Sequence, residues 1–273
     1  MPPPPPDRCL LAFMPCYNES ATVAATVRAT LDAGVDWVIV ADDGSRDDSL
    51  AALTREADRT GRVFVLRLRA NRGVAAAKLA GFSLAWLLYR QGRVPPTTLL
   101  AKLDSDGQHD PAYIPAMAAE LERRGLDMLL SRRDFSAYPR YKVAGNLAVS
   151  AFASALAGQR LRDSMSGLKV LRMPVVGRVL EYFTGDRYAA AQEITMIPCM
   201  TGMRLANDFR VDIPIYRSGS GMRDGLSVLR MSVASFLRVR LGRALDPDRR
   251  AREVLADPNI EIVRCPLPLD PAP

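Results

Sequence analysis

The 273-residue sequence predicts an α/β protein with a mostly parallel central sheet flanked by helices. Apolar runs of strand length alternate with longer runs of helix length through the first two-thirds of the chain. The connections between them are short, which is typical of right-handed βαβ units. The turns that follow the strands are polar and several carry aspartates, and ligands of such sheets bind beyond the carboxyl ends of the strands.

Strands and helices are expected to alternate from residue 9 to residue 133. The expected strands are 9–15, 36–45, 62–68, 97–104 and 126–133. The helices expected between them are 18–34, 46–58, 73–92 and 111–125. Asn18 or Ser20 is a candidate cap for the first of these helices, Gly34 ends it, and Pro111 suits the first turn of the last.

After residue 134 the alternation of strands and helices is less regular. Helices are expected at 141–159 and, in spite of Pro198, at 188–205. The segment 162–172 is expected to be a loop that enters a strand, and 208–217 is expected to be a strand. The Gly-rich segment 218–225 predicts a flexible loop.

The C-terminal part predicts a basic amphipathic helix at 225–245 and a charged, then Pro-rich, tail that is partly disordered. One face of the helix would carry Leu226, Leu229, Val233, Phe236 and Leu237. The helix either packs on the domain or lies on an anionic membrane. The expected division is a catalytic domain at 1–225, followed by helix and tail at 226–273.

The formal net charge of +7 suits phosphate ligands, an anionic membrane, nucleic acid or merely a soluble surface. Nucleic acid is disfavoured, because the basic residues are not interleaved with aromatic ones and acidic turns occupy the ligand face. Four cysteines without C-x-x-C spacing and a single histidine indicate free thiols rather than a zinc site. Without a signal peptide or a run of spanning length, we expect a cytoplasmic protein, either soluble or peripheral on the inner membrane face.

Acidic residues gather where the fourth expected strand ends. Asp104 ends the strand, Asp106 follows on the same side of an extended chain, and Gln108 is two residues further on. These oxygen ligands suit Mg²⁺ or Mn²⁺, and Mg²⁺ is commonly held by one or two carboxylates together with substrate phosphates. The alternative is that the aspartates only shape the turn, a role that fits Asp110 as a helix cap. His109 is expected to be a neighbour of this site rather than its catalyst.

Five motifs in order resemble a family 2 glycosyltransferase with the GT-A fold, and most of all the dolichol- or polyprenyl-phosphate sugar synthases. They read MPCYNESATV, VIVADDGSRDDS, NRGVAAAKLAG, KLDSDGQHDP and DSMSGLKVLR. The similarity covers roughly residues 9–217. It implies inverting, metal-dependent transfer of a sugar from a GDP- or UDP-sugar to a polyprenyl phosphate.

The resemblance also implies a nucleotide-sugar site at the strand ends. Tyr17 would flank the base unless it belongs to the core, and Glu19 would hydrogen-bond to the nucleoside. Asp43 would contact the base, since a carboxylate can accept a base N–H, whereas Asp42 would cap the turn. Lys78 would close over base and ribose unless it is a solvated helix charge. The full expected set is Pro15, Tyr17, Glu19, Asp43, Asn71, Gly73, Lys78, Asp104, Ser105 and Asp106.

The acceptor side follows from the same resemblance. Arg132 in "SRR" would bind the acceptor phosphate, unless it forms a surface ion pair. Arg217 and Arg223 lie in a loop that departs from the family order, so which arginine binds phosphate stays open. Asp106 is the expected catalytic residue on the leaving-group side. A phosphate acceptor is already anionic, whereas an alcohol would need a base, for which Glu193 and then Asp163 are the candidates.

Three other functions share parts of this pattern. A family 2 glycosyltransferase acting on a soluble hydroxyl acceptor has the same donor site. A nucleotidyltransferase is disfavoured, because the turn "CYNES" after the first strand has no basic residue. A non-catalytic sugar-nucleotide-binding module is disfavoured by the presence of Asp43, Asp104 and Asp106.

Overall fold

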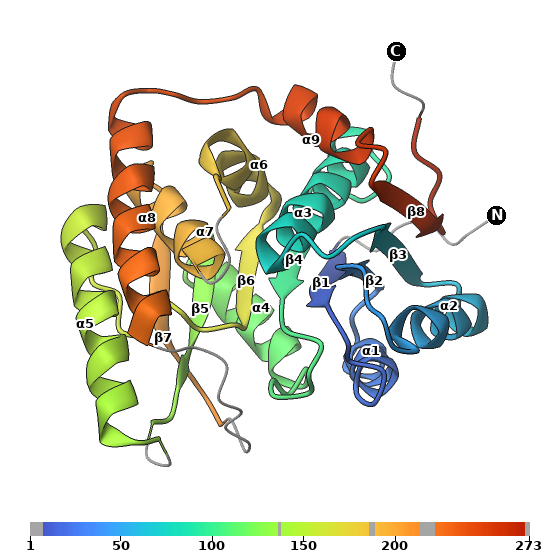
Figure 1. Cartoon of the computed structure of the whole chain (residues 1–273), viewed down its shortest axis with the longest axis horizontal. Helices are drawn as coiled ribbons and strands as arrows, with labels where there is room; N and C mark the ends of the chain where they lie inside the picture. The colour runs from blue at the N-terminus through green and yellow to red at the C-terminus, as the bar shows by residue number, and fades with distance from the viewer. Residues whose placement is uncertain (1–7, 136–137, 186–188, 213–221, 271–273) are drawn as a thin grey trace.

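The computed structural model describes residues 8–135, 138–185, 189–212 and 222–270. In these ranges the chain forms one eight-stranded sheet with helices on both faces (Figure 1). The strand order is β7-β5-β6-β4-β1-β2-β3-β8. The strands are β1 (Leu10–Cys16), β2 (Trp37–Asp42), β3 (Val63–Leu68), β4 (Leu99–Lys102), β5 (Met128–Arg133), β6 (Lys169–Arg172), β7 (Leu205–Val211) and β8 (Ile260–Arg264).

The prediction of a mostly parallel sheet is confirmed. Strands β4, β1, β2 and β3 are parallel neighbours, and β7 is parallel to β5. Strand β6 lies between β4 and β5 and is antiparallel to both, so β5 and β7 run in the same direction as β4. Strand β8 is antiparallel to β3. The chain leaves β1 toward β2 on one side and comes back as β4 on the other, which makes this the switch point where ligands bind.

Two apolar layers cover the sheet because successive side chains of each strand point to opposite faces. Leu11 and Phe13 join the core under α3 (Val74–Arg90), α6 (Met173–Tyr182) and α7 (Ala189–Met200). Leu10, Ala12 and Met14 join the core under α1 (Val23–Asp32), α2 (Ser49–Thr60) and α4 (Tyr113–Arg123). Every residue of β1 is buried, which explains its uninterrupted apolar sequence.

Helix α3 lies unusually close to β1. A Cβ atom at Gly81 would sit 2.0 Å from Cε2 of Phe13, so only glycine permits this approach. Helix α3 is buried over most of its length. It therefore forms the centre of the larger apolar layer.

The four cysteines are free, as predicted. Cys9, Cys16 and Cys199 are buried, and burial raises the pKa of each thiol to about 12. Thiols of this kind pack as small apolar groups and are poor nucleophiles.

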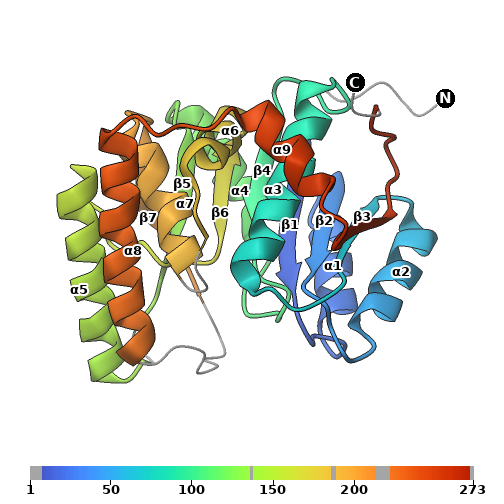
Figure 2. The same ribbon diagram turned by 45° about the horizontal axis from the view of Figure 1, so that its top comes forward.

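The disorder expected for the tail is contradicted in the segment that forms α9 (Pro247–Leu255) and β8. Asp246 caps α9 by accepting a hydrogen bond from Arg249 N at 2.6 Å. Asp248 accepts a hydrogen bond from Nε1 of Trp86 at 2.7 Å, which holds α9 against α3 (Figure 2). Strand β8 then extends the sheet beside β3, so the predicted boundary at residue 225 divides segments that share one sheet.

In the middle of the chain, the structure differs from the predicted secondary structure at three further points. Helix α6 was not predicted, although proline in its first turn and apolar residues four apart were available signals. The helix expected at 188–205 is α7, which ends at Met200, and the strand expected at 208–217 begins earlier, at Leu205. The expected helices 141–159 and 225–245 correspond to α5 (Arg140–Ala157) and α8 (Met222–Arg240). Most of the Gly-rich loop lies outside the described residues.

Candidate active site

The loops that leave β1, β2, β3 and β4 meet at the carboxyl edge of the sheet. The first two are joined by hydrogen bonds between their backbones and side chains. Asn18 N donates to Ser45 Oγ at 2.9 Å, and Arg46 N donates to Asn18 Oδ1 at 2.9 Å. Asn18 therefore adopts a φ of +54° and links two loops instead of capping α1, as the sequence had suggested. Ser20 N likewise donates to Asp47, so Ser20 is part of the same junction.

The first loop is also joined to the aspartate turn. Ser105 Oγ donates to Pro15 O at 2.9 Å. Thr22 Oγ1 lies 2.9 Å from Glu19 Oε2 and 3.1 Å from Ser105 O, so it bridges Glu19 to the turn after β4. The side chain of Tyr17 is 39% exposed, which excludes the core position that the sequence left open. These contacts bring three expected donor-site residues, Pro15, Glu19 and Ser105, to one edge.

Asp42 and Asp43 have different surroundings, as predicted. Asp42 caps the turn by accepting hydrogen bonds from the backbone N–H and the hydroxyl of Ser45. Asp43 Oδ1 accepts from Arg72 N at 2.9 Å, and Asp43 N donates to Cys16 O at 2.8 Å. Burial raises the pKa of Asp43, while the backbone N–H of Arg72 acts against that rise. Asp43 thus holds together the loops after β1, β2 and β3.

The loop after β3 packs directly on the loop after β2. A Cβ atom at Gly44, which has a φ of +68°, would lie 2.7 Å from the backbone N of Asn71. Gly73 has a φ of +89° and precedes the first residue of α3. Arg72 Nη1 lies 2.7 Å from Oδ2 of Asp257, which follows α9. The C-terminal segment therefore supports this loop, with Asn71 left exposed.

Asp104 pairs with a lysine that sequence reasoning missed. Lys102 Nζ lies 2.5 Å from Asp104 Oδ1, and the Lys102 side chain is 3% exposed. Burial acts to raise the pKa of Asp104, but the charges of Lys102, His109 and Lys78 outweigh it and hold that pKa well below its usual range. The signal was available in the sequence, where Lys102 interrupts the otherwise apolar run "LLAKL".

Three buried lysines gather on the face of the sheet that α3 and α7 cover. Lys102 of β4 pairs in register with Lys169 of β6, and Lys78 comes from α3. Lys169 Nζ donates to Ala191 O at 2.9 Å and to Thr195 Oγ1 at 2.6 Å. Lys78 is 4% exposed, so it is not the solvated helix charge that the sequence also allowed.

Replacing Lys78 with methionine is expected to stabilise the fold. Burial, reinforced by the charge of Lys102, lowers the pKa of Lys78 to about 7. An unfolded chain keeps the ordinary lysine pKa, so it binds more protons than the folded chain between pH 7 and pH 10, and wild-type stability should rise with pH in that window. Since one pKa unit corresponds to about 1.4 kcal/mol, Lys78→Met should add roughly 2–4 kcal/mol at pH 7 and flatten the slope. Urea unfolding at pH 7 and pH 9.5 measures both effects. Lys78→Arg, which keeps its charge, should instead destabilise.

Asp106 and Gln108 fit a hard divalent cation. Asp106 is half-buried, its Oδ1 accepts the N–H of Gln108 at 3.0 Å, and no described residue forms an ion pair with it. Within the described ranges, no group of three or more His, Cys, Asp or Glu side chains could hold a metal by itself. Such a site suits Mg²⁺ or Mn²⁺ if substrate phosphates complete the coordination.

His109 is buried beside the aspartates. Neither ring nitrogen has a hydrogen-bond partner among the described residues, and Nδ1 lies 3.8 Å from Asp104 Oδ2. Burial lowers the pKa of His109, more than the Asp104 charge raises it. A Cβ atom at Gly167 would lie 2.4 Å from His109 Cε1 and 2.5 Å from Asp104 Oδ2. The "DSMSG" loop therefore packs directly on the aspartate turn, as a glycine alone allows.

Asp110 has a local role. Its Oδ1 accepts the N–H of Ala112 at 2.9 Å, in the turn that precedes α4. Helix α4 begins at Tyr113, so Asp110 shapes this turn rather than capping the helix itself.

Asp163, a candidate base, is engaged in a buried ion pair. Arg133 donates to Asp163 through Nε at 2.8 Å and through Nη2 at 2.7 Å. The backbone N–H of Arg133 adds a third hydrogen bond at 3.1 Å, and Asn146 Nδ2 lies 3.3 Å from Oδ1. The second arginine of "SRR" therefore has a structural partner that the sequence did not indicate.

Arg132, the expected phosphate-binding residue, has no hydrogen-bond or ion-pair partner in the described part of the chain. It is half-buried at the end of β5, and its pair in the ladder is Arg210 of β7. The surface ion pair considered as an alternative is therefore not formed with any described residue. Arg217 lies outside the described residues, and so does the side chain of Arg223.

Glu193, the first candidate base, is buried on α7 and accepts several hydrogen bonds. Oε1 lies 2.5 Å from Thr184 Oγ1 and 2.6 Å from Ser235 Oγ, and Oε2 accepts from Gly185 N at 2.8 Å. Glu193 thus joins the segment after α6 to α8.

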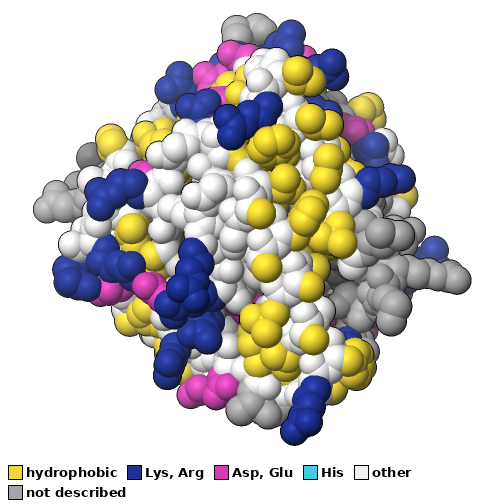
Figure 3. Space-filling model, turned by 90° about the vertical axis from the view of Figure 1, so that its left-hand side faces the viewer, with side chains coloured by type: hydrophobic (Ala, Val, Ile, Leu, Met, Phe, Trp, Pro, Cys, Tyr) yellow, Lys and Arg dark blue, Asp and Glu magenta, His cyan; other side chains and the backbone are white. Residues whose placement is uncertain are grey.

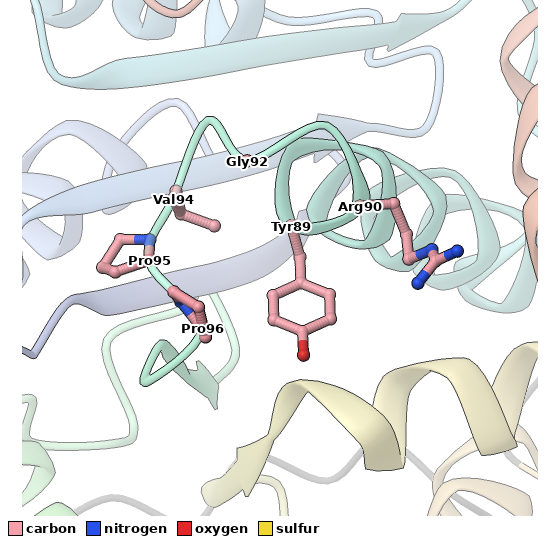
Figure 4. A pocket seen from close by; sticks show the side chains of 6 residues that line it. All are labelled: Tyr89, Arg90, Gly92, Val94, Pro95 and Pro96. Atoms are coloured by element: carbon pink, nitrogen blue, oxygen red, sulfur yellow. The ribbon is translucent and has the colours of Figure 1, made fainter.

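A shallow hollow lies elsewhere, where α3 ends and the chain turns toward β4 (Figure 4). Its walls are Tyr89, Arg90, Gly92, Val94, Pro95 and Pro96. This is the amino edge of the parallel strands, opposite the aspartate turn, where ligands of such sheets do not usually bind.

Comparisons with known proteins agree on one family. The family described as Glycosyl transferase family 2 matches residues 12–205. The dodecaprenyl-phosphate galacturonate synthase of Rhizobium johnstonii is 30% identical over 196 residues, which are 69% of this chain and 55% of that protein. The UDP-N-acetylglucosamine–dolichyl-phosphate N-acetylglucosaminyltransferase of Methanococcus voltae is 24% identical over 70% of this chain and 80% of its own length.

Among solved structures, the glucosyl-3-phosphoglycerate synthase of Mycobacterium tuberculosis has a similar fold. A complex of that enzyme with Mn²⁺ and UDP-glucose superposes with a TM-score of 0.60. The alignment covers 86% of this chain and 80% of that one at 18% identity. At this identity the likeness concerns the fold alone.

Proposed function

Because the chain belongs to glycosyl transferase family 2 and is a nucleotide-sugar glycosyltransferase of GT-A fold, we propose that its acceptor is a polyprenyl phosphate. The donor would be a GDP- or UDP-sugar, transferred with inversion at the anomeric carbon. One observation supports the assignment of the donor site. Hydrogen bonds join the loops after β1, β2, β3 and β4, with Asp43, Asp104 and Asp106 at a single edge of the sheet.

On the donor side, each residue keeps the role that its surroundings allow. Tyr17 is exposed at the first loop and would stack on the base. Asp43 is oriented by Arg72 N through Oδ1, and Oδ2 would accept a hydrogen bond from the base. Glu19, held by Thr22, would bind the nucleoside. Pro15, Asn71, Gly73, Lys78 and Ser105 would shape or line the same site.

On the leaving-group side, Asp106 and Gln108 would hold Mg²⁺ or Mn²⁺ with the donor diphosphate. A bound divalent cation would act as a Lewis acid and neutralise the charge of the departing nucleotide. Asp106 has no cationic partner among the described residues, so its carboxylate is available for that role. Holding donor and acceptor in one geometry supplies much of the remaining rate enhancement.

On the acceptor side, both candidate bases are already engaged by neighbouring residues, and this favours a phosphate acceptor. Asp163 is bound by Arg133, and Glu193 accepts hydrogen bonds from Thr184, Gly185 and Ser235. An alcohol acceptor needs a free carboxylate base, whereas a phosphate monoester is already anionic near pH 7. Two relatives are named as transferases to dodecaprenyl and dolichyl phosphate, which supports the same choice.

A lipid-extraction assay tests the proposal. The chain is incubated with Mn²⁺, a labelled UDP- or GDP-sugar and polyprenyl phosphate in detergent. Label in the organic phase supports the lipid acceptor. Label only in a water-soluble product supports the soluble-acceptor alternative. Binding of the sugar nucleotide in a thermal-shift assay without any transfer supports the non-catalytic module.

Arg132→Ala is expected to weaken use of the acceptor more than binding of the donor. Loss of one arginine–phosphate contact should raise KM for polyprenyl phosphate about 10- to 100-fold, because charge-assisted hydrogen bonds are worth roughly 1.5–3 kcal/mol. The donor affinity, measured by calorimetry, should change little. Arg210→Ala removes the neighbouring arginine of the ladder and serves as the matched control. Equal losses for donor and acceptor would show that Arg132 has a structural role.

We also propose that α5 and α8 lie on an anionic membrane. Helix α8 packs inward through Val228, Ser232 and Ser235, and leaves Val233 and Leu237 exposed. Apolar residues thus point away from the protein, which favours the lipid-bound alternative for this helix. Among the described helices none is long and apolar enough to cross a membrane.

The neighbouring helix extends this surface. Tyr141 and Leu147 are exposed on α5, which packs beside α8, and Leu241 and Leu245, which follow α8 in the chain, are exposed as well. Figure 3 shows that hydrophobic side chains gather in a band on this side of the molecule. Neither α5 nor the segment 225–245 contains an acidic residue, although both contain basic ones. Apolar side chains among cations and no carboxylates complement a bilayer with negative headgroups. The membrane would bring a lipid-linked acceptor to the protein.

Flotation with vesicles measures this contact. The chain should float with vesicles that contain about 30% anionic lipid, and less with neutral vesicles or at high salt, since screening weakens charge attraction. Leu237→Asp/Leu241→Asp should abolish flotation without lowering the thermal midpoint, because both side chains are exposed. Leu50→Asp, a half-buried position on the distant helix α2, provides a comparison for a carboxylate placed elsewhere. Unchanged flotation of the Leu237/Leu241 variant would refute the proposed surface.

A further inference from the structure

Lys102 stands out because it is a buried cation with a single ionic partner. Its side chain is 3% exposed, and Nζ lies 2.5 Å from Asp104 Oδ1. Leu100, two residues earlier in β4, belongs to the apolar layer under α3, so Lys102 projects into that same layer. A buried ammonium needs a partner of opposite charge, because desolvation of an unpaired cation is costly.

Asp104 is the counter-ion of Lys102, because the buried carboxylates of Asp163 and Glu193 are engaged by other groups. Asp163 is bound by Arg133, and Glu193 is bound by Thr184, Gly185 and Ser235. Lys169, the register partner of Lys102, instead donates to the neutral groups Ala191 O and Thr195 Oγ1. The Lys102–Asp104 pair is therefore distinct from the contacts of Lys169, which has only neutral partners.

The two aspartates of "DSD" consequently differ in their ionic partners. The Lys102 side chain is buried and that of Asp104 is 37% exposed, and a divalent cation ligated through Asp104 Oδ1 would lie next to the ammonium and be repelled by it. Asp106 has no ion-pair partner among the described residues and sits beside Gln108. Coordination through Asp106 avoids the repulsion, whereas coordination through Asp104 does not.

We propose that Lys102 is a positioning residue that occupies Asp104 as a built-in cation and confines the divalent cation to Asp106, Gln108 and the donor diphosphate. The proposal rests on the proposed function, since it assigns the metal to the donor site described above. It follows that the protein binds the metal weakly until the nucleotide supplies phosphate oxygens. The metal and the sugar nucleotide would then bind as one unit.

Mn²⁺ binding without nucleotide tests the role of Lys102, with the free ion followed by electron paramagnetic resonance. Lys102→Met should bind Mn²⁺ about tenfold more tightly than the wild type, since Asp104 becomes available as a ligand. Lys102→Arg keeps the cation and should remain near the wild-type affinity. Lys169→Met removes a neighbouring buried lysine without freeing Asp104, so it should change the affinity less than about threefold. Equal affinities for Lys102→Met and the wild type, or an equal gain for Lys169→Met, would overturn the proposal.

A second measurement does not depend on whether Lys102→Met folds. With UDP or GDP present, Asp106→Asn should lose Mn²⁺ binding, whereas the double variant Asp104→Asn/Lys102→Gln, which removes both charges of the pair, should retain it within about threefold. Loss of Mn²⁺ binding in both variants would show that Asp104 is a ligand and refute the assignment. Both experiments measure Mn²⁺ binding, and neither depends on sugar transfer. A chain that binds Mn²⁺ in the expected pattern but transfers no sugar would therefore refute the proposed function alone.

Discussion

Replacing Asp106 with alanine is expected to lower sugar transfer by about 100- to 1,000-fold, the usual effect of removing one preorganised electrostatic group. The carboxylate of Asp106 would hold the divalent cation with Gln108, and no described residue neutralises it. The fold should survive, because Asp106 is half-buried and its one described hydrogen bond is local, to Gln108 N. Initial rates at saturating donor and Mn²⁺, together with a thermal melt, measure both effects.

Asp110→Ala is the matched control for Asp106→Ala. Asp110 is exposed, four residues further along the same turn, and its carboxylate accepts the N–H of Ala112. Its removal should cost about 1 kcal/mol of stability, as expected for the loss of one hydrogen bond, and leave the rate of transfer unchanged. Wild-type activity in Asp106→Ala, or full wild-type activity in EDTA, would contradict the role of Asp106.

Asp163→Asn should lower the free energy of unfolding by roughly 3–5 kcal/mol, as expected when one partner of a buried ion pair is removed. Asp163 is fully buried and receives two hydrogen bonds from the guanidinium and one from the backbone of Arg133. Without its carboxylate, a largely buried guanidinium would keep its charge with no counter-ion. Urea unfolding gives the change in stability directly.

The double variant Asp163→Asn/Arg133→Met separates this structural role from general-base catalysis. Removing both charges should recover much of the lost stability, because a buried ion pair can be replaced by uncharged side chains at little cost. If Asp163 acts instead as the base, Asp163→Asn should lower the rate of transfer by about 100- to 10,000-fold while leaving stability near that of the wild type. That second result would revive the soluble alcohol acceptor.

The first four strands and the helices between them were predictable because their signals are local. A strand buried on both faces, such as β1, has an uninterrupted apolar sequence, and each ends in a polar turn. Asp43, Asp104 and Asp106 could be placed at one edge from this pattern, since parallel strands present their carboxyl ends together. The family resemblance assigned the base contact to Asp43 and left Asp42 as the turn cap, and Asp42 accepts hydrogen bonds from Ser45 in that turn.

Other features depend on contacts between distant segments. Arg132 and Arg133 are adjacent and identical in sequence, but only Arg133 lies beside Asp163, thirty positions later, in the described structure. The tail looked unstructured because its charges had no visible partners. Trp86 bonds to Asp248 and β3 pairs with β8, and these contacts order it.

By itself, the sequence determined the alternation of strands and helices, the polar strand-end turns and the family to which their motifs belong. Only the tertiary structure decided that Lys102 neutralises Asp104, that Asp163 and Glu193 are held by neighbours, and that α8 packs through serines. Periodicity and turn residues reflect interactions within a few positions of the chain. The partner of a buried charge and the direction of an amphipathic face depend on segments that meet only after folding, so no local pattern records them.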